Sequence, residues 1–174
     1  MSDGVGCADG GNAGAAAQVT AGAARRMVAA MPSPHQIARA AAAYWAAVFA
    51  FAFVLGIGRT LWLTPQIGAL AATACEVPLT LAASWWMARR LTAHYRIAGA
   101  RAALAMGLAA FAILMLAEVS LAGALSGQSL GAWLRSLATP AGALGLAGQV
   151  LFGLMPWWVT RHRQHAAQGQ HNGV

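Results

Sequence analysis

The chain has 174 residues, of which 59% are hydrophobic and only 9% are charged, and its mean hydropathy is +0.58. A soluble domain carries about 25% charged residues, so this composition excludes an ordinary soluble globular protein and predicts a membrane protein. The net charge of +7 comes from arginines that punctuate apolar segments, which argues against the continuous basic face of a nucleic-acid-binding domain.

The first part of the chain is rich in glycine and alanine. Residues 1–35 show no apolar period and nothing that resembles the basic start and apolar centre of a signal peptide. We interpret them as a disordered N-terminal tail. Met1, Met27 and Met31 are all candidate start residues, because nothing upstream of Met31 serves a membrane segment.

Four apolar segments follow, and each is long enough to cross a hydrocarbon core of about 30 Å as a helix. They are residues 40–63, 65–88, 102–125 and 140–160. The transmembrane domain is predicted to cover residues 36–163, and residues 164–174 form a polar C-terminal tail.

The connections between these segments differ in length. The very short one before Pro65 predicts a tight antiparallel hairpin, and the polar, glycine-bearing residues 126–139 predict a longer loop. We therefore predict an all-α fold, an integral membrane bundle of four transmembrane helices.

Arginine placement predicts the orientation of the bundle. All 11 basic residues are arginine, and only Arg59 and Arg135 fall on one side of the spans. The nine on the other side are Arg25, Arg26, Arg39, Arg89, Arg90, Arg96, Arg101, Arg161 and Arg163. Because loops rich in basic residues stay inside, both termini are predicted to be cytoplasmic.

The second and fourth segments end alike. WWMARR closes the second and PWWVTRHR the fourth, each about twenty residues after a proline, Pro65 or Pro140. This similarity between the two segment ends favours a duplicated helical hairpin. Membrane interfaces alone also favour Trp and Arg at helix ends, so both readings stay open.

Glu76 is the most informative ionisable residue. It lies about 16 Å along its span, and Gln149 lies about 13 Å along the fourth span from the same side, so both fall near the midplane. Thr73 and Thr80 share the helical face of Glu76. Because a charged carboxylate is costly at this depth, we expect Glu76 to be protonated or paired. It would act either as hydrogen-bonded glue between helices or as a titrating transport group.

Two further ionisable residues, Arg59 and Glu118, fall in the outer third of their spans. Depth therefore predicts two polar levels, with Glu76 facing Gln149 in the middle and Arg59 forming an ion pair with Glu118 toward the outside. Since Arg59 and Glu118 are near enough to the interface to reach water, their pair is expected to be structural.

Small residues line one face of the fourth span. Gly142, Gly145, Gly153 and Pro156 recur at helical spacing, which lets another helix approach closely. The alternative is a glycine-lined path beside Gln149, with Pro156 bending the inner end of the helix.

The residues needed for several kinds of catalysis are absent from the predicted spans. All five histidines lie outside the spans, so no pair is available for an intramembrane haem, and no Ser and His set or paired aspartates suit a membrane protease. His162, His165 and His171 could touch a metal, but polar tails with scattered histidines are the commoner case. We expect no enzyme, no cofactor and no metal.

The run FVLGIGRTLWLTPQIGALAATACEVPLTLAASWWMARR resembles a recurring pattern in uncharacterised bacterial inner-membrane proteins with four spans. The resemblance extends over residues 44–163 and implies a location in the bacterial inner (plasma) membrane, without implying an activity. The chain departs from the small multidrug carriers, whose essential glutamate lies in the first span. Here the first span carries Arg59 instead of a glutamate, which argues against a drug carrier of that kind.

Two functions are compatible with these features. The first is a non-catalytic accessory or assembly component of the membrane. The alternative is a small proton- or cation-coupled carrier or channel that uses a midplane glutamate. The expected partners are the lipid bilayer and either a second copy in a homodimer or a larger membrane complex, and we expect no nucleic acid.

Overall fold

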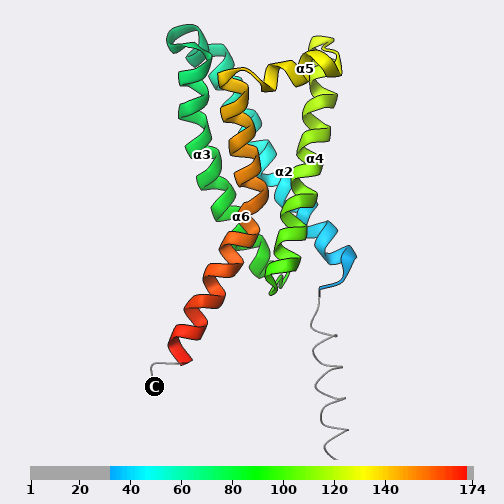
Figure 1. Cartoon of the computed structure of the whole chain (residues 1–174), viewed down its shortest axis with the longest axis vertical. Helices are drawn as coiled ribbons and strands as arrows, with labels where there is room; N and C mark the ends of the chain where they lie inside the picture. The colour runs from blue at the N-terminus through cyan, green and yellow to red at the C-terminus, as the bar shows by residue number, and fades with distance from the viewer. Residues whose placement is uncertain (1–31, 172–174) are drawn as a thin grey trace, which may run out of the picture. The chain divides into compact units, whose positions relative to one another are not determined.

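The computed structural model describes residues 32–171, and this part of the chain contains helices and no strand (Figure 1). The elements are α2 (Pro34–Gly58), the π-helical turn η1 (Arg59–Leu63), α3 (Thr64–His94), α4 (Ala100–Ser126), α5 (Leu130–Leu137) and α6 (Pro140–His171). The prediction of an all-α fold is confirmed. Most of the predicted N-terminal tail and all three candidate start residues lie outside the described residues.

Among the described residues, three helical stretches are long and apolar enough to cross a membrane. They are Pro34–His94, Ala100–Ser126 and Pro140–Ala166. The chain is therefore a multi-pass membrane protein by the length and composition of its helices. The last helix continues beyond residue 163, so residues 164–171, which were predicted to belong to a polar tail, extend α6.

The first stretch folds back on itself at Gly68 (Figure 1). Gly68 has φ of 80° and ψ of 162°, a conformation that glycine adopts easily because it has no Cβ. The reversal was predicted just before Pro65, but the helix continues past that proline. The wide π-helical turn η1 immediately precedes Pro65, where the proline ring would clash with the preceding turn of a regular α-helix.

Serine caps explain one element that the sequence analysis missed. Ser129 Oγ accepts a hydrogen bond from the backbone N–H of Ala132 at 3.3 Å and so caps the start of α5. This helix lies within residues 126–139, which were predicted to be a loop. Ser33 begins α2 in the same way, accepting from the N–H of Gln36 at 3.2 Å. Gly127, with φ of 60°, ends α4 as a left-handed cap.

A tyrosine links the first and last long helices. The Tyr44 ring stacks on Phe152 with centroids 4.6 Å apart, and its hydroxyl donates to the Phe152 carbonyl at 3.0 Å. That carbonyl lacks its usual helical donor because Pro156, four residues later, has no N–H. Tyr44 and Pro156 are both fully buried. The proline in α6 therefore creates the acceptor that fastens α2 to α6.

Helices α4 and α6 cross at two glycines. A Cβ on Gly107 would overlap the carbonyl oxygen of Gly153 and lie 3.3 Å from Cδ of Pro156. Without side chains at this crossing, the two backbones approach closely enough for extensive van der Waals contact. Together with buried Tyr44 and Met106, this crossing forms a tightly packed part of the bundle.

Arginines stack on tryptophans near the ends of α3 and α6. The pairs are Arg89 with Trp85 at 4.7 Å, Arg90 with Trp86 at 5.0 Å and Arg161 with Trp157 at 5.2 Å from the ring centroid. The spacing of four residues places each guanidinium over the ring one turn earlier. This arrangement suits the interface between membrane and water, where an apolar ring and a charged group are both accommodated.

Candidate intramembrane binding site

A partly open cavity of about 810 Å³ lies among α2, η1, α3, α4, α5 and α6. Toward the Tyr44 contact its lining residues are Trp45, Val48 and Phe152, of which Val48 and Phe152 are 3% exposed. At its other end it reaches α5 through Trp133 and Ser136. The cavity is thus closed by the tightly packed part of the bundle and bordered by the short helix at the opposite end.

All six predicted polar site residues line this one cavity. They are Arg59, Thr73, Glu76, Thr80, Glu118 and Gln149. They come from η1, α3, α4 and α6, so the fold brings together residues that are up to 90 positions apart in sequence. The ionisable groups among the described lining residues are one arginine and two glutamates.

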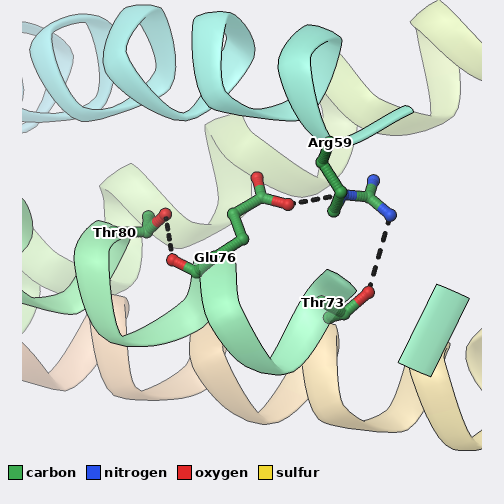
Figure 2. A network of polar contacts seen from close by, with 4 residues as sticks. All are labelled: Arg59, Thr73, Glu76 and Thr80. Atoms are coloured by element: carbon green, nitrogen blue, oxygen red, sulfur yellow. Dashed lines mark hydrogen bonds and ion pairs between the residues drawn. The ribbon is translucent and has the colours of Figure 1, made fainter. Parts of the chain in front are cut away.

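Arg59 and Glu76 form an ion pair across the first hairpin (Figure 2). Arg59 Nε lies 2.5 Å from Glu76 Oε2, and Arg59 Nη1 donates to Thr73 Oγ1 at 3.5 Å. The Nε contact has the length of an ion pair but not the alignment of a hydrogen bond, since Nε has no hydrogen-bond partner. The Arg59 and Glu76 side chains are 31% and 18% exposed, so the pair is largely shielded by protein.

The hydroxyl of Thr80 does not reach the Glu76 carboxylate. It donates to the Glu76 backbone carbonyl at 3.2 Å (Figure 2). Ser84 donates to the Thr80 carbonyl at 2.7 Å in the same way. These bonds to the carbonyl four residues earlier satisfy the polar stripe of α3 within its own helix. Glu76 therefore takes its side-chain partner from Arg59 rather than from a threonine.

A second polar pair joins α4 and α6. Gln149 Nε2 donates to Glu118 Oε1 at 2.5 Å, while Gln149 Oε1 is buried without a hydrogen-bond partner among the described residues. Glu118 thus has an amide partner but, in this part of the chain, no cationic one. A carboxylate bound only by a neutral amide keeps its charge uncompensated whenever it is ionised.

The two polar pairs differ from the pairs predicted from depth in the membrane. Arg59 pairs with Glu76 instead of Glu118, and Gln149 contacts Glu118 instead of Glu76. The error came from placing the reversal before Pro65. Counted from Gly68, Arg59 and Glu76 are nine and eight residues away, about 13 Å each, so they face one another at one depth.

The predicted glycine face of α6 has two parts. A Cβ on Gly142 would overlap the Ser136 carbonyl oxygen at the end of α5, and Gly153 lies against α4. Gly145, between them, has no atom within 4 Å of its Cβ position and lines the cavity. Pro156 lies beyond the cavity, in the tightly packed end. The face therefore serves close packing at Gly142 and Gly153 and leaves open space at Gly145.

Buried polar side-chain atoms without a hydrogen-bond partner are found around the cavity. Within residues 32–166, whose side chains the structure describes, the buried side-chain atoms without a hydrogen-bond partner are Trp45 Nε1, Arg59 Nε, Thr64 Oγ1 and Gln149 Oε1. Trp45, Arg59 and Gln149 line the cavity, whereas Thr64 does not. Arg59 Nε is already paired with Glu76 Oε2, so Trp45 Nε1 and Gln149 Oε1 are the lining atoms without any polar partner among the described residues. Unpartnered buried polar atoms are rare in native proteins, so water or a polar solute in the cavity would supply the missing partners.

Aromatic residues of α2 are lining residues that the sequence analysis missed. Trp45, Phe49 and Phe53 all line the cavity, with successive ring centroids 5.3 and 6.0 Å apart. Their spacing of four residues was visible in the sequence and places them on one helical face. We call these three residues the aromatic row.

In the described part of the chain, no group of three or more His, Cys, Asp or Glu side chains is arranged to hold a metal ion. Cys75 is exposed on α3 and is not a lining residue of the cavity. The polar chemistry of the cavity therefore rests on one guanidinium, two carboxylates, an amide, indole N–H groups and hydroxyl groups.

Comparison with protein-family models, with curated proteins and with solved structures gave no match to this chain.

Proposed function

We propose that the protein crosses the bacterial inner membrane four times, with both termini in the cytoplasm, and acts as a small carrier that takes a polar solute into the cavity. The reversal at Gly68 supports four crossings. It divides Pro34–His94 into arms of about 50 Å and 40 Å, each longer than a hydrocarbon core of about 30 Å.

The arginines support this orientation. Those at the ends of α3 and α6 and in the connection to α4 gather at one end of the bundle, whereas Arg135 lies on α5 at the other end (Figure 1). By the tendency of basic residues to remain inside, the end with α5 faces away from the cytoplasm. The cavity, which is bordered by α5, is then reached from the non-cytoplasmic side.

The observation that carries the proposal is that two buried polar atoms without a partner among the described residues, Trp45 Nε1 and Gln149 Oε1, belong to residues that line one cavity at membrane depth. Polar groups there are costly unless a partner satisfies them, so their clustering favours a site that receives a polar solute. Glu76 is neutralised by Arg59, whereas Glu118 has no cation beside it among the described residues. We therefore assign proton or cation coupling to Glu118.

Proton flux into liposomes tests this function. We expect purified wild-type protein to conduct protons under an imposed pH gradient, and Glu118→Gln to reduce the flux at least tenfold. The variant should keep its hydrogen bond to Gln149, because an amide oxygen still accepts. Leu116→Ala, an exposed site on the same helix, is the matched control and should conduct like wild type.

A specific feature favours the accessory function as the second candidate. Both polar pairs join neighbouring helices, Arg59 to Glu76 and Gln149 to Glu118, which is how polar residues hold transmembrane helices together. In that case a homodimer or a larger membrane complex would be the functional unit. Flux equal to that of protein-free liposomes, with Glu118→Gln only melting earlier, would favour this candidate over the carrier.

A further inference from the structure

The charges that face the cavity do not balance. Arg59 lies 2.5 Å from one Glu76 carboxylate oxygen, so these two groups compensate each other. Glu118 is left with the neutral amide of Gln149. With both carboxylates ionised, the described lining residues carry one positive and two negative charges, a balance that favours a cation over an anion.

The hydrogen-bonding groups near Glu118 favour a donor. Gln149 Oε1 is buried without a partner and is an acceptor, and it belongs to the amide that binds the Glu118 carboxylate. Two acceptors on adjacent side chains suit an N–H group that carries positive charge. A carboxylate ligand would instead meet like charge at this position.

The aromatic row supplies the apolar part of the site. Trp45, Phe49 and Phe53 form a continuous stacked series along α2, and α2 packs against α4, which carries Glu118. The faces of aromatic rings attract cations, and the attraction strengthens where water is excluded. A cation with apolar substituents can therefore contact the aromatic row while its charged group meets Glu118.

We propose that the cavity binds a small substituted ammonium ion, with Glu118 as its counter-charge, Gln149 Oε1 as a hydrogen-bond acceptor and the aromatic row around its apolar substituents. This inference rests on the proposed carrier function and names its class of solute. An alkyl- or arylalkyl-ammonium ion of a few carbon atoms combines the positive charge, the N–H donor and the apolar surface that this lining recognises.

Calorimetric titration of the purified full-length protein in detergent micelles tests the proposal, with protein-free micelles as the blank. The probes are protonated N,N-dimethylbenzylamine and benzoate, which share the ring and differ in the sign of the charge. We expect saturable binding of the amine only. Glu118→Gln should weaken it at least tenfold, and Phe49→Leu, which keeps an apolar side chain, about fivefold.

The control Leu116→Ala lies on the outward face of α4, with the wild-type side chain 69% exposed, and should bind within twofold of wild type. Circular dichroism and gel filtration establish that each variant is folded. Benzoate binding as tight as the amine, an unchanged amine affinity in folded Glu118→Gln, or no binding of the amine would each overturn the inference. The proton flux of the wild-type protein decides the carrier function separately.

Discussion

Replacing Gly107 with alanine is expected to lower the free energy of unfolding by about 3 kcal/mol, because the new methyl group would overlap the Gly153 carbonyl where α4 crosses α6. The obstacle is backbone, which cannot turn aside as a flexible side chain can. The two helices would have to separate, and the contacts around Pro156 would loosen with them. Unfolding of the purified protein by a denaturing detergent, followed by circular dichroism, measures the change.

Gly123→Ala is the matched control in the same helix. Its Cβ would lie 3.9 Å from the Gln128 carbonyl oxygen, an ordinary contact. Because alanine is the better helix former, we expect a change within about 1 kcal/mol and in the stabilising direction. Equal effects at positions 107 and 123 would show that the close crossing of α4 and α6 is absent.

Breaking the Arg59–Glu76 pair by removing one partner is expected to destabilise the protein by about 2 kcal/mol. Glu76→Gln leaves the Arg59 guanidinium without its counter-charge in a partly shielded position. We expect less than the 3–5 kcal/mol of a fully buried pair, because the Arg59 side chain is 31% exposed. The double variant Arg59→Met with Glu76→Met should recover most of the lost stability, since no charge is then left unpaired.

A double-mutant cycle in the same unfolding assay gives the coupling between the two positions. Arg135→Met, which removes an exposed arginine on α5, serves as the control for loss of a positive charge and should change stability by less than about 0.5 kcal/mol. Strict additivity of the changes at positions 59 and 76 would contradict the ion pair.

Long apolar segments made the helices predictable, because about 20 uncharged residues leave few alternatives in a membrane. The position of the first reversal was not predictable from that rule. Both Pro65 and Gly68 can interrupt a helix, and only the backbone shows that the chain passes the proline and turns at the glycine. The helix α5 was not predicted because the capping residue Ser129 lies among polar and glycine residues that are typical of a loop.

The polar residues of the site were predictable individually, since ionisable groups within a span are few and costly. Their partners were not, because a shift of three residues in the reversal changes which side chains face each other. Arg59 and Glu76 became neighbours for this reason. The role of the aromatic row was also hidden, since i, i+4 aromatic spacing is equally suited to contact with lipid.

The duplicated hairpin stays a prediction, and one feature favours it. Arg59 and Glu76 lie nine and eight residues from the first reversal, and Glu118 and Gln149 lie eight and nine residues from the helix ends that flank the second connection. Each hairpin thus carries one polar pair at a similar depth, with α5 as an addition to the second. Equivalent placement of this kind is expected from repeated units.

The most direct test of a polar cavity that opens on one side is labelling of a single cysteine at position 145. Gly145 lines the cavity and has room for a side chain, with no atom within 4 Å of its Cβ position. Cys7 and Cys75 are first replaced by serine, and sealed vesicles of both orientations are treated with a thiol reagent that does not cross membranes. Ala110→Cys, a fully buried position on α4, is the control for protected sites.

We predict labelling of the cysteine at position 145 from the non-cytoplasmic side and protection from the cytoplasmic side, with the cysteine at position 110 protected from both. Equal protection of the two cysteines from both sides would contradict a cavity that water reaches. Labelling of position 145 from the cytoplasmic side alone would contradict the proposed orientation of the bundle.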